Sequence, residues 1–137
     1  MPRYQLLVIE DEADIAELIC HAAGEMGMDT RHACNFDALT EILAAFTPDI
    51  ILLDIMMPEK DGFEVLRFLH EQRHPARILV ISGDAHYRPM AFRMGEGLAV
   101  EVVGVLAKPF RLSELRLALA EIVAMLDEPD TGTQGVA

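Results

Sequence analysis

The chain has 137 residues, of which 52% are hydrophobic, and this length and composition suit one domain that folds without a disulfide or a structural metal. Its formal net charge of −12 disfavours direct binding to nucleic acid, which depends on clustered Lys and Arg, and favours a cation or a basic partner surface. No apolar run approaches the roughly 20 residues of a membrane span and the start is not signal-like, so we expect a cytoplasmic protein that does not enter a membrane.

Apolar runs and helical periodicities alternate along the chain. Short apolar runs without turn formers are typical of buried strands in a parallel sheet, and apolar spacings of three and four are typical of helices. In chain order, we expect a strand at residues 6–9, a helix from 13, a weak strand at 30–34, a helix from 36, a strand at 50–53, a helix from 63, a strand at 77–81, a helix from 89, a strand at 102–106 and a helix at 112–126.

Several helix ends carry a sequence signal. The first helix is expected to stop at Gly24 or Gly27, because glycine readily adopts the backbone conformation that ends a helix. Asn35 is expected to cap the second helix, and Pro48 to end that helical segment. Pro89 is expected to open the fourth helix at its first turn.

Five strands that alternate with five helices predict an α/β fold with a doubly wound parallel sheet. Right-handed crossovers leave few topologies, and the strand order 2-1-3-4-5 is one of the two common ones. We expect this domain to span residues 1–126. Residues 127–137 have no large apolar side chain apart from Val136, which predicts a disordered tail or the stub of a linker.

Polar residues follow four of the expected strands: Glu10 and Asp11, Asp54, Ser82 and Lys108. Parallel strands put their carboxyl ends at one edge of the sheet, where ligands bind in such folds. Neighbouring carboxylates repel one another and would attract a cation, for which Mg²⁺ is the natural candidate. With that charge neutralised, Asp54 would attack a phosphorus atom as a nucleophile, and Ser82 and Lys108 would help to hold the phosphoryl oxygens.

These residues carry a resemblance to a known family. The acid pair after the first strand, the LLDIMMPEKDG segment at residues 52–62, the hydroxyl residue after the fourth strand and the KPF sequence after the fifth resemble the receiver domain of two-component response regulators. The resemblance covers about residues 4–126. It is specific because four motifs occur in the right order, each after a hydrophobic strand. It implies a flavodoxin-like sheet of order 2-1-3-4-5.

The resemblance implies a metal site and a phosphoacceptor. Asp54 is similar to the phosphoacceptor, Asp11 to the acid that binds the metal directly, and Glu10 to a neighbour that binds it directly or through water. The backbone carbonyl of Met56 would complete the ligands from the protein. The implied metal is Mg²⁺, or Mn²⁺ in its place.

The resemblance also implies a switch. Ser82 is similar to the hydroxyl residue that moves onto the phosphoryl group, and Lys108 to the lysine that bonds it, with a cis peptide bond between Lys108 and Pro109. The donor would be a histidine kinase or a histidine phosphotransfer protein. Phosphorylation adds charge and hydrogen-bond acceptors, which would change binding to a downstream protein partner or output domain. Catalysis would be limited to the protein's own phosphoryl transfer and dephosphorylation.

The chain departs from the family pattern at four places. Glu10 replaces the commoner Asp, Gly83 stands where Ala is usual, and Val105 stands where a switch aromatic is common. The segment between Ser82 and Lys108 is longer than usual. These departures keep a second hypothesis open, in which the chain is a receiver-like interaction module that does not rely on phosphorylation.

Two enzyme or cofactor hypotheses are less well supported. A phosphohydrolase similar to the haloacid dehalogenases requires a second Asp, as general acid, two residues after the nucleophile, and Met56 occupies that position. Flavin binding wants a Ser/Thr/Gly-rich phosphate loop, and none follows residues 6–9. Because residues 127–137 are not expected to form an effector domain, we expect either a stand-alone receiver or one cut from a larger protein, and the sequence leaves the output open.

Simpler interpretations exist for each polar residue. Asp54 would be a solvated loop acid, Glu10 and Asp11 would favour a helix N-terminus, and Ser82 and Lys108 would be a turn hydroxyl and a surface charge. We expect Cys20 and Cys34 to be reduced, packed thiols. The histidines lack the spacing of metal ligands, so we expect structural or surface roles for all of them: His21, His32, His70, His74 and His86.

Overall fold

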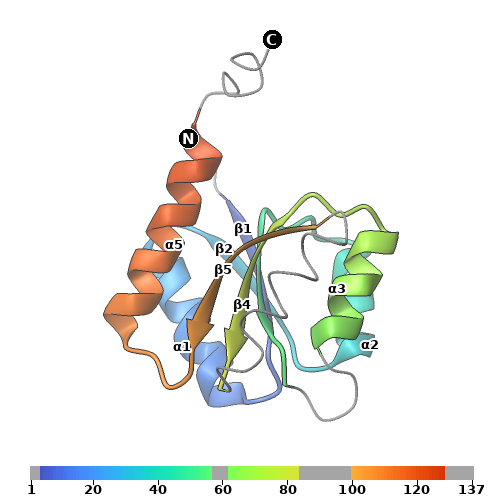
Figure 1. Ribbon diagram of the computed structural model, residues 1–137, viewed down its shortest axis with the longest axis horizontal. Coiled ribbons are helices and arrows are strands. Elements are labelled where there is room, and N and C mark those ends of the chain that lie inside the picture. Colours follow the sequence, from blue (N-terminus) through green and yellow to red (C-terminus); the bar gives the residue numbers. More distant parts are fainter. Residues whose placement is uncertain (1–3, 57–61, 84–99, 129–137) are drawn as a thin grey trace.

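The computed structural model describes residues 4–56, 62–83 and 100–128. Its elements follow the expected alternation of strands and helices (Figure 1). In chain order they are β1 (Gln5–Ile9), α1 (Ala13–Glu25), β2 (Asp29–Ala33), α2 (Phe36–Leu43), β3 (Ile50–Asp54), α3 (Gly62–Glu71), β4 (Arg77–Ser82), β5 (Glu101–Ala107) and α5 (Leu112–Asp127). The helix expected from residue 89 and residues 129–137 of the expected tail lie outside the described residues. The expected boundary at 126 is one residue too early, because α5 continues to Asp127.

The strands form one parallel sheet in the order β2-β1-β3-β4-β5, which confirms the predicted fold and strand order. Helices α1 and α5 cover one face of the sheet, and α2 and α3 cover the other (Figure 1). All strands run the same way, so their carboxyl ends share one edge. No helix in the described part of the chain is long and apolar enough to cross a membrane.

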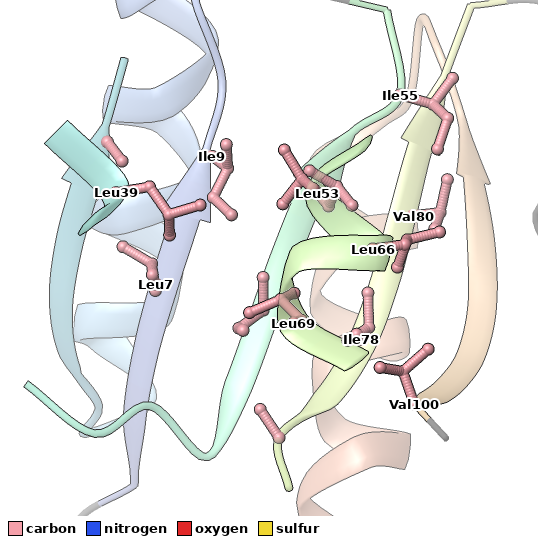
Figure 2. Packing of buried hydrophobic residues seen from close by; sticks show 14 of the residues in the cluster. Leu7, Ile9, Leu39, Leu53, Ile55, Leu66, Leu69, Ile78, Val80 and Val100 are labelled. Atoms are coloured by element: carbon pink, nitrogen blue, oxygen red, sulfur yellow. The ribbon is translucent and has the colours of Figure 1, made fainter. Parts of the chain in front are cut away.

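The central strand β3 explains why the sheet is stable between two helical layers. Every residue of β3 is buried, and successive side chains point to opposite faces. Ile51 and Leu53 join the cluster under α2 and α3, part of which Figure 2 shows, whereas Ile50 and Leu52 join the cluster under α1 and α5. Each such side chain contributes about 1.5–3 kcal/mol by leaving water.

Two of the expected helix signals are present as predicted. The backbone N–H of Ala38 donates a 2.8 Å hydrogen bond to Asn35 Oδ1, so Asn35 caps α2. The chain leaves α1 through Gly27, whose φ of 88° lies in the left-handed region that favours glycine. The helix itself ends two residues earlier, at Glu25.

The start of α3 depends on a close backbone approach. A Cβ atom added to Gly62 would lie 2.5 Å from Ile55 Cα, a distance that real side chains do not adopt. The Gly62 N–H also donates a 2.9 Å hydrogen bond to the Ile55 carbonyl. Glycine therefore lets α3 begin directly against the residue that follows Asp54.

The prediction for the cysteines is right for one residue and wrong for the other. Both thiols are free, as expected, and Cys20 is half-buried. Burial raises the pKa of the Cys20 thiol, although a hydrogen bond with Thr30 opposes this shift. Cys34 is exposed and not packed, because it follows the end of β2, the outermost strand on its side of the sheet.

Candidate functional site

The predicted site residues lie at the carboxyl edge of the sheet because their strands end in register. Ile9, the last residue of β1, pairs with Leu53, and Glu10 follows it directly. Ala107, the last residue of β5, pairs with Ser82, and Lys108 follows it directly. Asp54 is the last residue of β3. Hydrophobic strands thus deliver acids, a hydroxyl and a lysine from four separate parts of the chain to one edge.

Three carboxylates gather there as the sequence predicts. Glu10, Asp11 and Asp54 each offer an oxygen atom, and these oxygens all lie within 4.8 Å of one another. Glu10 is 0% exposed and Asp54 is 2% exposed, whereas Asp11 is exposed to solvent. The two buried acids therefore carry their charges away from water, which is costly unless a cation compensates them.

Lys108 supplies part of that compensation. Its Nζ lies 3.0 Å from Glu10 Oε1 and donates a hydrogen bond of 3.3 Å to Asp54 Oδ2. Nζ also donates a 3.3 Å hydrogen bond to Glu12 Oε1, a contact that the sequence did not predict. The only sequence signal for Glu12 is that it is the third acid in the run after β1. Its reach across to Lys108 depends on the folded geometry.

The electrostatics of the cluster follow from burial. Burial raises the pKa of the Glu10 carboxyl to about 7, and the charge of Asp54 adds to this shift, whereas contacts with Lys108 and the Glu12 N–H oppose it. For Lys108, burial alone would lower the pKa, but Glu10 and Asp54 outweigh it and the pKa is raised. Lys108 is therefore charged at neutral pH, whereas Glu10, with its raised pKa, is partly protonated there.

The cluster suits a hard divalent cation. Glu10 Oε1 is buried and has no hydrogen-bond partner among the described residues, since its contact with Lys108 lacks hydrogen-bond geometry. Oxygen donors in a carboxylate group of this kind are the ligands that Mg²⁺ prefers. The residues present therefore fit a Mg²⁺ ion, and a bound cation would satisfy the buried Glu10 oxygen.

The other predicted site residues lie close to Asp54 or Lys108. The Met56 N–H donates a 3.0 Å hydrogen bond to Asp54 Oδ1, which fixes one oxygen of this carboxylate. Ser82 is 4% exposed, and its carbonyl accepts a 2.8 Å hydrogen bond from the Lys108 N–H. The peptide bond between Lys108 and Pro109 is cis, as the resemblance implies. The roles of the Met56 carbonyl and the Ser82 hydroxyl stay predictions.

The structure describes the surroundings of two residues that depart from the family pattern, Gly83 and Val105. Among the described residues, a Cβ atom added to Gly83 would meet Lys108 Cβ alone, at the ordinary contact distance of 3.9 Å, so none of these residues hinders the usual alanine. Val105 is half-buried and packs against the cluster under α2 and α3. The longer segment that precedes β5 includes residues 84–99, which lie outside the described residues.

An apolar pocket of about 290 Å³ lies beside the site. Its lining comes from one face of α1 and from the loop that follows β5: Ile15, Leu18, Lys108, Pro109 and Phe110. Leu18 is 40% exposed. The pocket thus joins exposed apolar surface directly to the lysine of the site.

The described histidines have structural partners. His32 Nε2 lies 2.6 Å from the Glu10 carbonyl oxygen, and His74 Nδ1 accepts a hydrogen bond from the Ala76 N–H. Burial lowers the pKa of His74. In the described ranges, the group of potential metal ligands contains no histidine, and His86 lies outside those ranges.

A parallel sheet of this order with an acidic cluster and a lysine at its carboxyl edge defines a class of signalling domain. Residues 6–120 match the family model described as the response regulator receiver domain. The chain belongs to this family, and it is a receiver domain of two-component signalling.

The curated relatives that the chain resembles are longer than the chain itself. It is 31% identical over 115 residues to the regulatory protein AtoC of Escherichia coli, covering 82% of this chain and 24% of AtoC. It is also 31% identical over 135 residues to the response regulator MprA of Mycobacterium leprae, covering 97% of this chain and 56% of MprA. The chain thus spans about a quarter and about half of these two relatives.

Solved structures agree on the fold. The receiver domain of the Francisella response regulator 1452 has a TM-score of 0.77 at 24% identity, covering 91% of this chain and all of that domain. The chemotaxis response regulator CheY4 of Vibrio cholerae has a TM-score of 0.74 at 22% identity, covering 88% of this chain and 99% of CheY4.

Proposed function

We propose that this receiver accepts a phosphoryl group on Asp54 and thereby switches its binding to a downstream partner or output domain. The observation that carries the proposal is the position of Asp54. Its carboxylate is 2% exposed, lies among three clustered acids and accepts a hydrogen bond from Lys108. Asp54 is thus a buried acid surrounded by groups that suit both a cation and an anionic phosphoryl group.

The donor in this proposal is a phosphohistidine of a histidine kinase or a histidine phosphotransfer protein. A carboxylate oxygen of Asp54 forms a bond to phosphorus as the bond between phosphorus and the imidazole nitrogen breaks. The electron pair of that bond stays on the imidazole, which takes up a proton, and Asp54 becomes an aspartyl phosphate. No external substrate is turned over, so the catalysis is confined to the protein's own phosphorylation and dephosphorylation.

Residues around Asp54 have separate roles in this reaction. The Met56 N–H holds Asp54 Oδ1 and so orients the carboxylate. Lys108 keeps its charge and supplies N–H donors to the arriving phosphoryl oxygens, and the Ser82 hydroxyl at the end of β4 would bond another oxygen.

The proposed cofactor is Mg²⁺, or Mn²⁺ in its place. Glu10, Asp11, Asp54 and the backbone carbonyl of Met56 would hold it. When bound, such an ion neutralises charge on the phosphoryl oxygens and the carboxylates. Because Glu10 is completely buried, its carboxylate depends on a cation more strongly than the exposed carboxylate of Asp11 does.

The apolar pocket next to Lys108 supports a protein as the donor. The exposed side chain of Leu18 and the half-buried ring of Phe110 offer apolar area for a partner helix beside the site. The net charge of −12 favours a partner with a basic surface. It also supports the prediction that this chain does not bind nucleic acid directly.

The switch in this proposal is a change of charge at the carboxyl edge. Phosphorylation replaces one carboxylate charge by about two negative charges and adds acceptor oxygens. Ser82 and Lys108 would respond, and both belong to the end of the β4 and β5 pair. Val105 on β5 packs against the cluster on the α2 and α3 face of the sheet and would have to relay this change without an aromatic ring.

The test is the intact mass of the protein after incubation with acetyl phosphate, with and without Mg²⁺. Wild type is expected to gain one phosphoryl group only with Mg²⁺, and Asp54→Asn to gain none. Asp14→Asn, which removes an exposed acid in the first turn of α1, is the matched control and should behave like wild type. If neither acetyl phosphate nor a phosphorylated phosphotransfer protein modifies wild type, the phosphorylation-independent module becomes the better account.

A further inference from the structure

Glu12 forms a contact that the proposed chemistry does not use. Its Oε1 accepts a hydrogen bond of 3.3 Å from Lys108 Nζ, the same distance as the bond from Nζ to Asp54 Oδ2. The Glu12 side chain is 61% exposed, whereas that of Lys108 is 16% exposed. Glu12 therefore holds the lysine from the solvent side of the site.

We propose that Glu12 is a positioning residue that restrains Lys108 in the unphosphorylated site and so slows the modification of Asp54. This inference rests on the proposed function. It adds a residue that sets how fast the switch can be loaded and that binds neither metal nor phosphoryl group.

The hydrogen-bonding capacity of the Lys108 ammonium group is limited. Lys108 Nζ has three N–H donors and no acceptor. Two of them point to Asp54 and Glu12, and Glu10 Oε1 lies 3.0 Å away. An arriving phosphoryl group needs donors from the same nitrogen. One of those donors becomes available only when the hydrogen bond between Lys108 Nζ and Glu12 Oε1 breaks.

The backbone explains why the Glu12 side chain is available for this contact. Glu12 is the N-cap residue of α1, but its side chain makes no capping hydrogen bond. Its backbone is anchored on both sides instead: its N–H donates to Glu10 Oε2 at 3.2 Å, and its carbonyl accepts from the Ala16 N–H at 3.1 Å. The residue is thus fixed at the rim of the site while its carboxylate reaches Lys108.

The expected effect is modest because the carboxylate is exposed. Exposed ion pairs contribute little, which corresponds to a change of about two- to fivefold in a rate that requires the contact to break. The charge of Glu12 also repels an anionic phosphoryl donor, so the restraint and the charge act in the same direction. Two substitutions separate them: Glu12→Gln removes the charge, and Glu12→Asp keeps the charge but shortens the side chain by one methylene.

The experiment measures the rate of Asp54 phosphorylation over a range of acetyl phosphate concentrations at fixed Mg²⁺. This yields a maximal rate and a half-saturating concentration for each protein. We expect Glu12→Gln and Glu12→Asp both to raise the maximal rate about two- to fivefold. Glu17→Gln is the matched control, because Glu17 is an exposed acid on α1 that forms no ion pair within the described residues, and its maximal rate should equal that of wild type.

The outcomes are distinct. If wild type is modified but Glu12→Gln is no faster, or is slower, the positioning role is wrong while the proposed function stands. If Glu12→Gln is faster but Glu12→Asp matches wild type, charge at the rim explains the effect and the restraint of Lys108 is overturned. If wild type itself is never modified on Asp54, it is the proposed function that has failed.

Discussion

Lys108 Nζ lies 3.0 Å from Glu10 Oε1, so the lysine after β5 and the acid after β1 meet at the centre of the carboxyl edge. Glu10 has one methylene more than the commoner Asp, which lengthens the reach of its carboxylate. The buried acid nevertheless lacks a hydrogen-bond partner at this oxygen among the described residues. Two predictions follow from the incomplete compensation of Glu10.

The first concerns the pH dependence of stability without metal. The pKa of Glu10 is raised to about 7 in the folded protein from an ordinary value of 4.5, so the folded state binds this proton more tightly than the unfolded state. Its contribution to stability is therefore complete below about pH 4.5 and is lost as the pH rises through about 7. Urea unfolding of the metal-free protein between pH 5 and pH 8 should show this decline. Glu10→Gln, which cannot titrate, should lack the part of the decline that is due to Glu10. If the free energy of unfolding of the two proteins depended on pH in the same way, the raised pKa of Glu10 would be contradicted.

The second concerns Mg²⁺. The ion needs Glu10 as a carboxylate, so protons compete with it, and its stabilising effect should be larger at pH 8 than at pH 6. The measurement is the rise in Tm on adding Mg²⁺ at each pH. Asp11→Asn should reduce the rise by removing a ligand, and Asp14→Asn, with its acid outside the cluster, should keep it. An equal rise in Asp11→Asn and wild type would remove Asp11 from the proposed metal site.

A third prediction tests the close approach at the start of α3. Gly62→Ala places a Cβ atom 2.5 Å from Ile55 Cα, and backbone cannot move aside cheaply, so we expect a loss of about 1–3 kcal/mol in the free energy of unfolding. Gly24→Ala is the matched control. An added Cβ at Gly24 has no neighbour within 4 Å in the described part of the chain, and alanine in a helix is favoured over glycine by about 0.5–1 kcal/mol. Equal stability of the two variants would mean that α3 can shift away from Ile55.

Much of the fold is encoded in local patterns that a sequence displays. The apolar run at residues 50–53 predicts a strand buried on both faces, and β3 is buried at every residue. The Asn35 cap is likewise a local signal, and the hydrogen bond from Ala38 confirms it. The common edge of the polar residues follows from parallel strands alone, which is why the acid cluster was predictable.

Side-chain reach and exposure were less accessible from the sequence. The contact between Glu12 and Lys108 joins residues at opposite ends of the chain, and its formation depends on which rotamers fill the rim of the site. The exposure of Cys34 depends on β2 being the outermost strand on its side, a property of the whole sheet. The orphaned oxygen of Glu10 similarly depends on hydrogen-bond angles that residue spacing does not specify.

The most direct test of the account is to locate the phosphoryl group itself. The protein is incubated with acetyl phosphate and Mg²⁺, treated with borohydride, which reduces an acyl phosphate to an alcohol, and digested for peptide mass mapping. The account predicts homoserine at position 54 in wild type, only when Mg²⁺ is present. Reduction product at another acid, or none at position 54 in a sample that carries the phosphoryl mass, would contradict Asp54 as the phosphoacceptor.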